Sequence, residues 1–94
     1  MFFVIHCEDH PDAVERRLAL HDEHKAYLSE SPMKVLVAGP ILAVDGKTRI
    51  GSIQLVEADE IEQVRRFNEN DPFFKKKVWN EIRINGFLKL TDNR

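Results

Sequence analysis

The sequence has very little cysteine: the only one among its 94 residues is Cys7. A single cysteine cannot form a disulfide bond within the chain, and it cannot supply the several thiolates of a structural zinc site. Because Cys7 lies in a short apolar segment, we interpret it as a small core residue rather than a nucleophile. We therefore expect a reduced, cytoplasmic protein.

The sequence also lacks a strong excess of one charge and a long apolar run. Fourteen Lys and Arg residues against sixteen Asp and Glu residues give a formal net charge of −2, whereas domains that bind nucleic acids are usually strongly basic. The longest apolar stretch, residues 35–44, is about half of a membrane span and is interrupted by Gly39 and Pro40. The opening segment MFFVIHCED has no basic region of the kind that begins a signal peptide. We expect no nucleic-acid partner, no membrane partner and no signal peptide.

What remains is sufficient for one small globular domain, which we expect to comprise residues 1–94. Hydrophobic residues make up 43% of the chain and charged residues 32%, a balance typical of globular domains. A chain of this length can bury one core, but it cannot enclose a large cofactor unless a second subunit forms part of the walls. We therefore expect no cofactor.

Apolar periodicity, together with Gly and Pro, divides the chain into six elements. In chain order these are a strand over residues 2–7, a helix over 12–30, strands over 33–44 and 49–57, a helix with Ile61, Val64 and Phe67 on one face, and a strand over 78–90. Pro40 cannot donate to a sheet and predicts an edge or a bulge, and Asp45-Gly46 is typical of a hairpin turn. Asp59 with Glu62 resembles a capping box. Gly86 predicts a bulge in the last strand.

The order β-α-β-β-α-β indicates an α+β protein of the ferredoxin-like type, in which an antiparallel sheet carries its helices on one face. The other face must be polar or must be covered by a partner. The strands carry apolar side chains on both faces, such as Val4 against Ile5, and the last strand adds Trp79 and Phe87 to the face away from the helices. We therefore expect two sheets to pack face to face in a homodimer, because an exposed apolar face of that size favours aggregation.

The first predicted helix carries titratable side chains on its apolar side. At about 100° per residue, Arg17, His21 and His24 fall on the side that also carries Leu20 and Tyr27. Desolvating such groups is unfavourable unless they are paired or face an open cavity. His24 either lines a cleft between helix and sheet or is a buried histidine satisfied by a backbone carbonyl, and the spacing alone favours the second interpretation.

Other polar residues have ordinary structural explanations when the pattern is taken alone. Asp71 precedes Pro72, which is typical of a helix cap. Ser52 lies in a predicted strand without the sharp turn that exposes a catalytic serine. His21 and His24 are three residues apart, as metal ligands can be, but no third ligand stands at a diagnostic spacing, so we expect no metal site.

Short motifs along the chain resemble those of the YciI-like (YCII-related) family. They are, in order, Phe2-Phe3-Val4-Ile5, His24 with Leu28, Ala38-Gly39-Pro40, Asp45-Gly46, Gly51-Ser52 and Asn70-Asp71-Pro72-Phe73. The resemblance implies a dimeric α+β barrel built on the ferredoxin-like unit, with a site that combines His24 and Asp71. Where the family often has an arginine three residues before the histidine, this chain has His21, and Arg17 is the candidate to supply that charge.

On this basis we hypothesise that His24 and Asp71 form a catalytic dyad. Asp71 would accept a hydrogen bond from one ring nitrogen, and the other nitrogen would act as general base and then acid on a small metabolite, in a proton abstraction, an elimination or an isomerisation. The candidate substrate-binding residues are Arg17, His21, Tyr27, Ser52 and Phe73. The alternative is a non-catalytic module that binds a small molecule or modulates a partner enzyme, and a third interpretation makes the pair purely structural.

Overall fold

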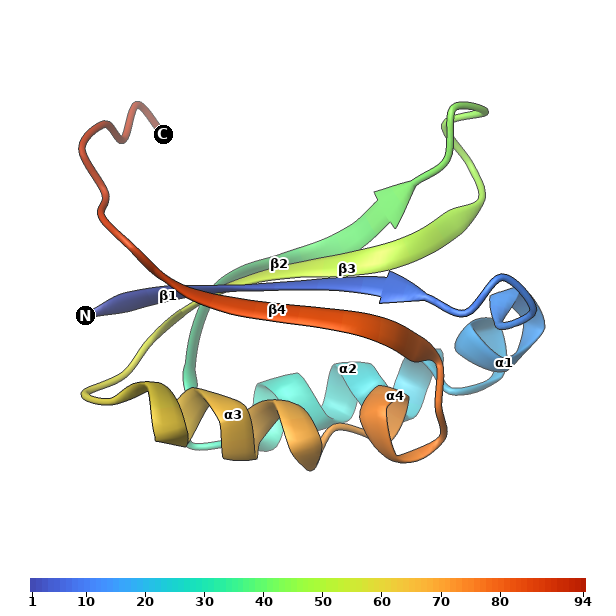
Figure 1. Cartoon of the computed structure of the whole chain (residues 1–94), viewed down its shortest axis with the longest axis horizontal. Coiled ribbons are helices and arrows are strands. Elements are labelled where there is room, and N and C mark those ends of the chain that lie inside the picture. Colours follow the sequence, from blue (N-terminus) through green and yellow to red (C-terminus); the bar gives the residue numbers. More distant parts are fainter.

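A four-stranded antiparallel sheet lies above a layer of helices in the computed structural model, which describes residues 1–94 (Figure 1). The elements are β1 (Phe2–Asp9), α1 (Val14–Ala19), α2 (His21–Glu30), β2 (Lys34–Leu42), β3 (Arg49–Glu57), α3 (Ile61–Glu69), α4 (Pro72–Lys75) and β4 (Trp79–Phe87). The strand order is β2-β3-β1-β4, and every neighbouring pair is antiparallel. This confirms the predicted α+β fold of the ferredoxin-like type.

The predicted helix over residues 12–30 is divided into two helices. α1 ends at Ala19 and α2 begins at His21, because Leu20 leaves the helical conformation with φ −97° and ψ 3°. The backbone of Leu20 still makes helical hydrogen bonds on both sides of the bend. Its N–H donates to the Arg16 carbonyl, and its carbonyl accepts from the His24 N–H. No Gly or Pro marks the bend, so the usual sequence signal of a helix break is missing. As a result, α1 lies at the end of the sheet and α2 beneath it (Figure 1).

The start of α3 differs from the predicted capping box by one position. Glu60, not Asp59, holds the cap position in an extended conformation, and its partner is Gln63 rather than Glu62. The side-chain oxygen of Gln63 accepts the backbone N–H groups of Asp59 and Glu60, each at 3.0 Å. One neutral amide oxygen therefore satisfies two backbone donors at the start of the helix.

The edge strand β2 runs without interruption through Pro40. An edge strand tolerates proline because one of its sides needs no ladder hydrogen bonds, which agrees with the predicted edge position. Its register with β3 shifts between Val35 and Val37 and again after Ile41. The following turn is at Asp45-Gly46 as predicted, and Gly46 has a left-handed φ of +69° that glycine adopts without strain.

The core lies between the helices and the sheet. Its buried apolar side chains are Phe3, Ile5, Cys7, Ala13, Val56, Val64, Phe67, Phe73, Val78 and Trp79. The predicted place of Trp79 on the opposite face is wrong, since the side chain is 5% exposed and belongs to this core. The register between β1 and β4 shifts between Glu8 and Asp9, so that Asp9 pairs with Trp79 and the alternation along β4 is lost there. Gly86, where the bulge was expected, is paired with Phe3 without a shift.

The opposite face of the sheet is covered by no helix (Figure 1). Val37 and Ile53 lie on this open face, because they alternate with the inward-facing residues of their strands, and they are 45% and 43% exposed. The C-terminal segment approaches one end of it, where the Lys89 ammonium nitrogen lies 5.1 Å from the centre of the Phe2 ring. The expected homodimer would cover this face, and that expectation stays a prediction.

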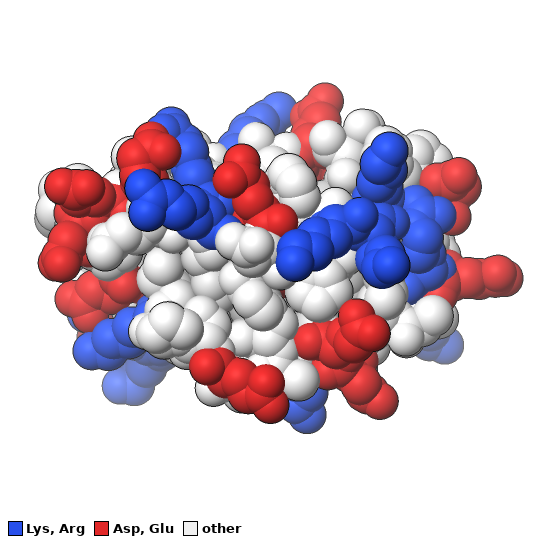
Figure 2. All heavy atoms as spheres, turned by 90° about the horizontal axis from the view of Figure 1, so that it is seen from below, with Lys and Arg blue, Asp and Glu red and all other residues white.

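Figure 2 views the helix layer from below. Lys and Arg side chains are interspersed with Asp and Glu around a central group of uncharged residues. The exposed run Lys75-Lys76-Lys77 is part of α4 and the turn after it. The face therefore carries charge of both signs rather than one large basic patch. No helix has the length and apolar character needed to cross a membrane.

Candidate active site

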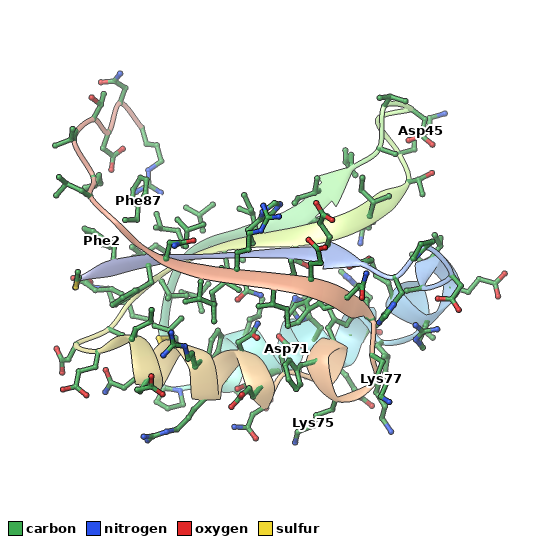
Figure 3. The ribbon with its side chains drawn as sticks, in the orientation of Figure 1. Phe2, Asp45, Asp71, Lys75, Lys77 and Phe87 are labelled. Carbon is green, nitrogen blue, oxygen red and sulfur yellow. The ribbon has the colours of Figure 1, made fainter.

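Asp71 is the most deeply buried carboxylate of the helix layer. It holds the N-cap position of α4, where its Oδ1 accepts the backbone N–H of Phe73 at 2.8 Å and Pro72 occupies the first helical turn. Its side chain is 1% exposed, and Figure 3 shows it in the space between the helices and the sheet. The cap expected from the sequence is therefore present, and it fixes the carboxylate in one orientation.

His24, near the middle of α2, contacts the same carboxylate. Its Nδ1 lies 2.9 Å from Oδ1 and 2.8 Å from Oδ2 of Asp71, and only the first contact has hydrogen-bond geometry. A carboxylate accepts only, so the imidazole must carry a hydrogen on Nδ1. Nε2 makes no hydrogen bond within the chain, and the side chain is 13% exposed. The arrangement leaves one ring nitrogen free to accept a proton.

Two aromatic rings hold the imidazole in place. His24 stacks on Phe73 with 4.0 Å between ring centres and 10° between planes, while Trp79 meets it edge to face at 6.1 Å. Phe73 and Trp79 also contact each other at 82°. The Asp-Pro-Phe segment thus fixes the imidazole twice, with Asp71 at its edge and Phe73 on its face.

Arg17 of α1 is buried next to this cluster and is already paired. Its Nε and Nη2 donate to the two carboxylate oxygens of Asp9 at 2.6 and 2.9 Å, and Nη2 also donates to Ser52 Oγ at 2.6 Å. The guanidinium carbon lies 4.6 Å from the centre of the Phe73 ring. Since Asp9 balances its charge, Arg17 in this arrangement positions Ser52 and Phe73 rather than presenting a free cation to an anion.

Ser52 accepts a second hydrogen bond, from the Trp79 indole N–H at 3.2 Å.

Asp9 and Trp79 were not among the predicted site residues. Asp9 could have been found, because the alternation that points Ile5 and Cys7 inward also points Asp9 inward. Trp79 could not, because the register shift beside it reverses the side predicted by alternation.

The other predicted residues lie at the margins of the cluster. His21 is partly exposed, and its Nδ1 lies 3.4 Å from Arg49 Nη1. The Tyr27 hydroxyl donates to the backbone carbonyl of Phe67 at 2.7 Å, and burial, followed by the nearby Asp71 charge, raises its pKa. The structure therefore brings His24, Asp71 and Phe73 together with Arg17 and Ser52 beside them, while Tyr27 and His21 make other contacts.

Cys7 lies in the same core but is not suited to act as a nucleophile. Burial raises the pKa of its thiol to about 12, and the negative charges of Asp71 and Asp9 act in the same direction. The hydrogen bond from Asn68 lowers the thiol pKa and offsets part of this effect. The reactive form of cysteine is the thiolate, so Cys7 stays a neutral core residue at neutral pH. No group of three or more His, Cys, Asp or Glu side chains is arranged to hold a metal ion.

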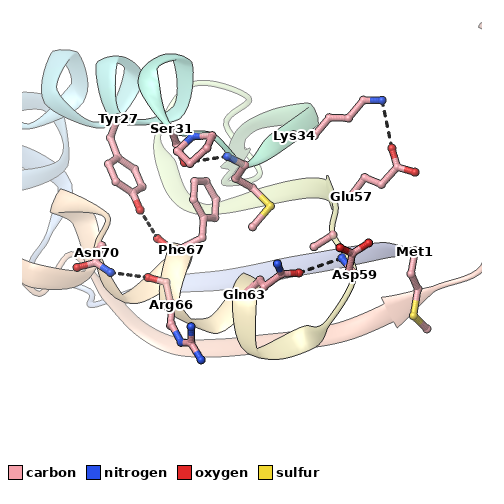
Figure 4. Close-up of a pocket in the computed structure, with 13 residues that line it drawn as sticks. Met1, Tyr27, Ser31, Lys34, Glu57, Asp59, Gln63, Arg66, Phe67 and Asn70 are labelled. Carbon is pink, nitrogen blue, oxygen red and sulfur yellow. Dashed lines mark hydrogen bonds and ion pairs between the residues drawn. The ribbon is translucent and has the colours of Figure 1, made fainter.

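A cavity of about 660 Å³ lies elsewhere, between the C-terminal end of α2, α3 and the end of β3 (Figure 4). Tyr27, Met33, Gln63 and Phe67 are among its 13 lining residues, but His24 and Asp71 are not. The cavity contains no histidine and no buried carboxylate. We place the candidate chemistry at the dyad because its imidazole is fixed by a buried carboxylate. In the cavity, the Tyr27 hydroxyl is already donated to Phe67 and the Lys34–Glu57 ion pair is exposed to solvent.

Comparison with known proteins agrees with the sequence motifs. The YCII-related domain matches residues 1–88. Protein YciI of Escherichia coli O6:H1 is 28% identical over 96% of this chain and 99% of its own length, and an uncharacterised protein of Haemophilus influenzae is 26% identical with the same coverage. Among solved structures, 5-chloro-2-hydroxyhydroquinone dehydrochlorinase of Burkholderia phenoliruptrix AC1100, in complex with 2,5-dihydroxybenzoquinone, has a TM-score of 0.83 and 30% identity over 94% of each chain. The chain therefore belongs to the YCII-related family.

Proposed function

We propose that the protein is a small acid/base enzyme in which His24 and Asp71 form the catalytic dyad. The observation that carries the proposal is the orientation of one imidazole. Its Nδ1 is fixed by the buried Asp71 carboxylate, which also caps α4, and its Nε2 has no partner in the chain. Nε2 is not one of the buried side-chain atoms that lack a partner, so a small molecule can reach it from outside the chain. A general base needs this combination of a fixed tautomer and a free nitrogen.

The proposed reaction is an elimination or isomerisation that begins with proton removal. Nε2 of His24 takes a proton from the substrate, and the positive charge that forms on the ring is balanced by the Asp71 carboxylate 2.8 Å away. In an elimination, the bond to the leaving group then breaks and its electron pair departs with that group. The proton on Nε2 returns to the product or to water, so the ring ends as it began.

The dehydrochlorinase, whose chain is 30% identical to this one, supports the proposed substrate class. We propose a small hydroxylated ring as substrate, because such a ring offers an acidic proton and can redistribute electrons when a leaving group departs. The aromatic side chains Phe73 and Trp79 that hold His24 also provide apolar surroundings in which a flat ring can bind.

We further propose that the protein acts as a homodimer with its open sheet faces packed together. Val37 and Ile53 are large apolar residues on that face, and each is more than two-fifths exposed in the single chain. Burial against a second copy would remove this surface from water, at about 25 cal/mol for each Å² of apolar area. Both copies of the dyad lie on the helix side of the sheet, so the interface leaves them separate.

Chloride release from 5-chloro-2-hydroxyhydroquinone tests the activity. The natural protein should release chloride, and His24→Gln should lower kcat by about 10²- to 10⁴-fold, the usual contribution of a general acid or base. His10→Ala is the matched control, because the His10 side chain makes no hydrogen bond and lies in the loop after β1. Unchanged turnover in His24→Gln would contradict the proposal, whereas binding of the ring by the natural protein without turnover would support a non-catalytic binding module.

A further inference from the structure

Gln54 is a buried polar residue whose amide has no partner. The residue is 1% exposed, and neither its Nε2 nor its Oε1 makes a hydrogen bond. It lies in the central strand β3, between Ser52 and Val56 along the strand, and all three face the helices. A buried amide that can form several hydrogen bonds and forms none is unfavourable in a folded protein, so its presence calls for a partner outside the chain.

The amide lies next to the candidate active site. Residues two apart on a strand point to the same face about 7 Å apart, so Gln54 follows directly after Ser52, which binds Arg17 and Trp79. The Trp79 ring in turn lies against His24. A row of buried polar side chains therefore runs from Asp9 and Arg17 through Ser52 to Gln54.

The edge strand β2 is exposed beside this row of buried polar side chains. Ala38 pairs with Gln54 and Pro40 pairs with Ser52 across the β2–β3 ladder, so these two residues also face the helix side. Both are exposed, unlike their partners. In Figure 1 α3 and α4 lie in front, beneath β4 and β1, and α2 lies behind them. The Gln54 amide is covered in the single chain, so a small molecule that enters over β2 reaches it only after the side chains above it move.

Ser52 provides a second group with unused hydrogen-bonding capacity. Its oxygen accepts from Arg17 at 2.6 Å and from Trp79 at 3.2 Å, which uses both acceptor positions of a hydroxyl. Its own hydrogen has no acceptor in the chain. The strand thus presents one directed hydroxyl donor and, next to it, an amide that can both donate and accept.

We propose that Gln54 is a specificity-determining residue that hydrogen-bonds the oxygen substituents of the substrate. The chemistry fits a small ring with a hydroxyl group, which donates to Oε1 and accepts from Nε2, and with a second oxygen close enough to accept from Ser52. This inference rests on the proposed function for the location of the chemistry, but it concerns recognition rather than turnover. A second copy of the chain does not provide the partner, because Gln54 faces the helices and the proposed dimer uses the opposite face.

The test is a pair of apolar substitutions combined with a matched pair of ring ligands. Gln54→Met keeps the length of the side chain and Gln54→Leu keeps much of its volume, and both remove the amide. Binding of 2,5-dihydroxybenzoquinone is compared with that of 2,5-dimethylbenzoquinone by titration calorimetry, and the melting temperature of each variant is measured without ligand. Parallel titrations with His24→Gln separate recognition from catalysis.

We expect both variants to melt at or above the temperature of the natural protein, because they remove an unpaired buried amide. We expect them to bind the dihydroxy ring about 10- to 100-fold more weakly and to bind the dimethyl ring as before, since a site built to hydrogen-bond a hydroxyl discriminates strongly. Equal binding of the dihydroxy ring by natural protein and variants, no binding by the natural protein, or marked destabilisation of both variants would overturn the inference. If the natural protein and His24→Gln bind the dihydroxy ring but the natural protein releases no chloride from 5-chloro-2-hydroxyhydroquinone, the proposed catalysis fails while the role of Gln54 stands.

Discussion

One carboxylate serves both the fold and the proposed chemistry in this protein. Asp71 Oδ1 accepts the backbone N–H of Phe73 and also faces Nδ1 of His24. Asparagine is as good a cap as aspartate, whereas alanine is a poor one. The two functions of Asp71 can therefore be separated by substitution.

We predict that Asp71→Asn lowers turnover strongly but stability little, because the side-chain oxygen can still cap α4 while the charge beside His24 is lost. Asp71→Ala should lose turnover as well and destabilise the protein by about 1 kcal/mol more, the usual cost of a lost cap. Urea unfolding and steady-state kinetics measure the two effects. Equal stability of the two variants would show that the cap contributes nothing.

Cys7 gives a prediction about alkaline pH. Its thiol has a pKa of about 12 in the folded protein and about 9.0 when unperturbed. Above pH 9 the unfolded chain loses this proton while the folded protein keeps it, so the free energy of unfolding falls as pH rises towards 12.

Comparison of the natural protein with Cys7→Ala between pH 8 and pH 10 measures this effect. The natural protein should lose more stability over that interval than the variant, and its thiol should react with a thiol reagent at pH 8 only after unfolding. Equal pH slopes, or rapid labelling of the folded protein, would contradict the burial of Cys7.

At the level of residues, the sequence indicated His24 and Asp71 only when two kinds of information were combined. Helical spacing placed His24 on the inward side but favoured a satisfied core histidine, and the Asp-Pro pattern indicated only a cap. Only the resemblance to the YCII-related family implied that His24 and Asp71 belong to one site. Gln54 was missed because a glutamine in an alternating strand carries no signal of burial, and its importance depends on the absence of a partner that only coordinates reveal.

Among the elements, the central strands β1 and β3 leave no room for a side chain at Gly51. A Cβ added there would lie 2.4 Å from the Cys7 carbonyl oxygen, which is a backbone atom of the neighbouring strand and cannot move aside easily. We predict that Gly51→Ala destabilises the protein by about 1–3 kcal/mol, the usual cost of overpacking.

Gly39→Ala is the matched control, since a Cβ at that position meets nothing within 4 Å. Chemical denaturation of the two variants measures the difference. If Gly39→Ala were as destabilising as Gly51→Ala, the effect would belong to glycine removal in general and not to the close approach of β1 and β3.

The order and type of the elements could be predicted, whereas two local irregularities could not. The bend at Leu20 has no Gly or Pro to announce it, and it is stabilised by contacts that α1 and α2 make with different parts of the chain, such as Arg17 with Asp9 and His24 with Asp71. The register shift at Asp9 depends likewise on tertiary pairing. Both irregularities lie at the candidate site, where Arg17 and Trp79 are brought next to His24.

For the whole molecule, we propose that the open sheet face forms the interface of a homodimer. We predict that the natural protein has the mass of two chains in light scattering and that Ile53→Lys has the mass of one, because a charge at the centre of the face cannot be buried without a partner. Leu18→Lys is the matched control, because Leu18 is also an exposed apolar residue but lies in α1 rather than in the sheet. A natural protein that stays monomeric, or a dimer unaffected by Ile53→Lys, would contradict the face-to-face assembly.

The proposed chemistry requires that Asp71 hold His24 with its hydrogen on Nδ1 and leave Nε2 free for the substrate. Long-range ¹H–¹⁵N NMR of the imidazole rings measures this directly. We predict that neutral His24 carries its hydrogen on Nδ1, that Asp71→Ala removes this preference because it removes the accepting oxygen, and that 2,5-dihydroxybenzoquinone shifts the Nε2 signal. A His24 ring that carries its hydrogen on Nε2, or whose Nε2 signal is unmoved by the bound ring, would contradict the account.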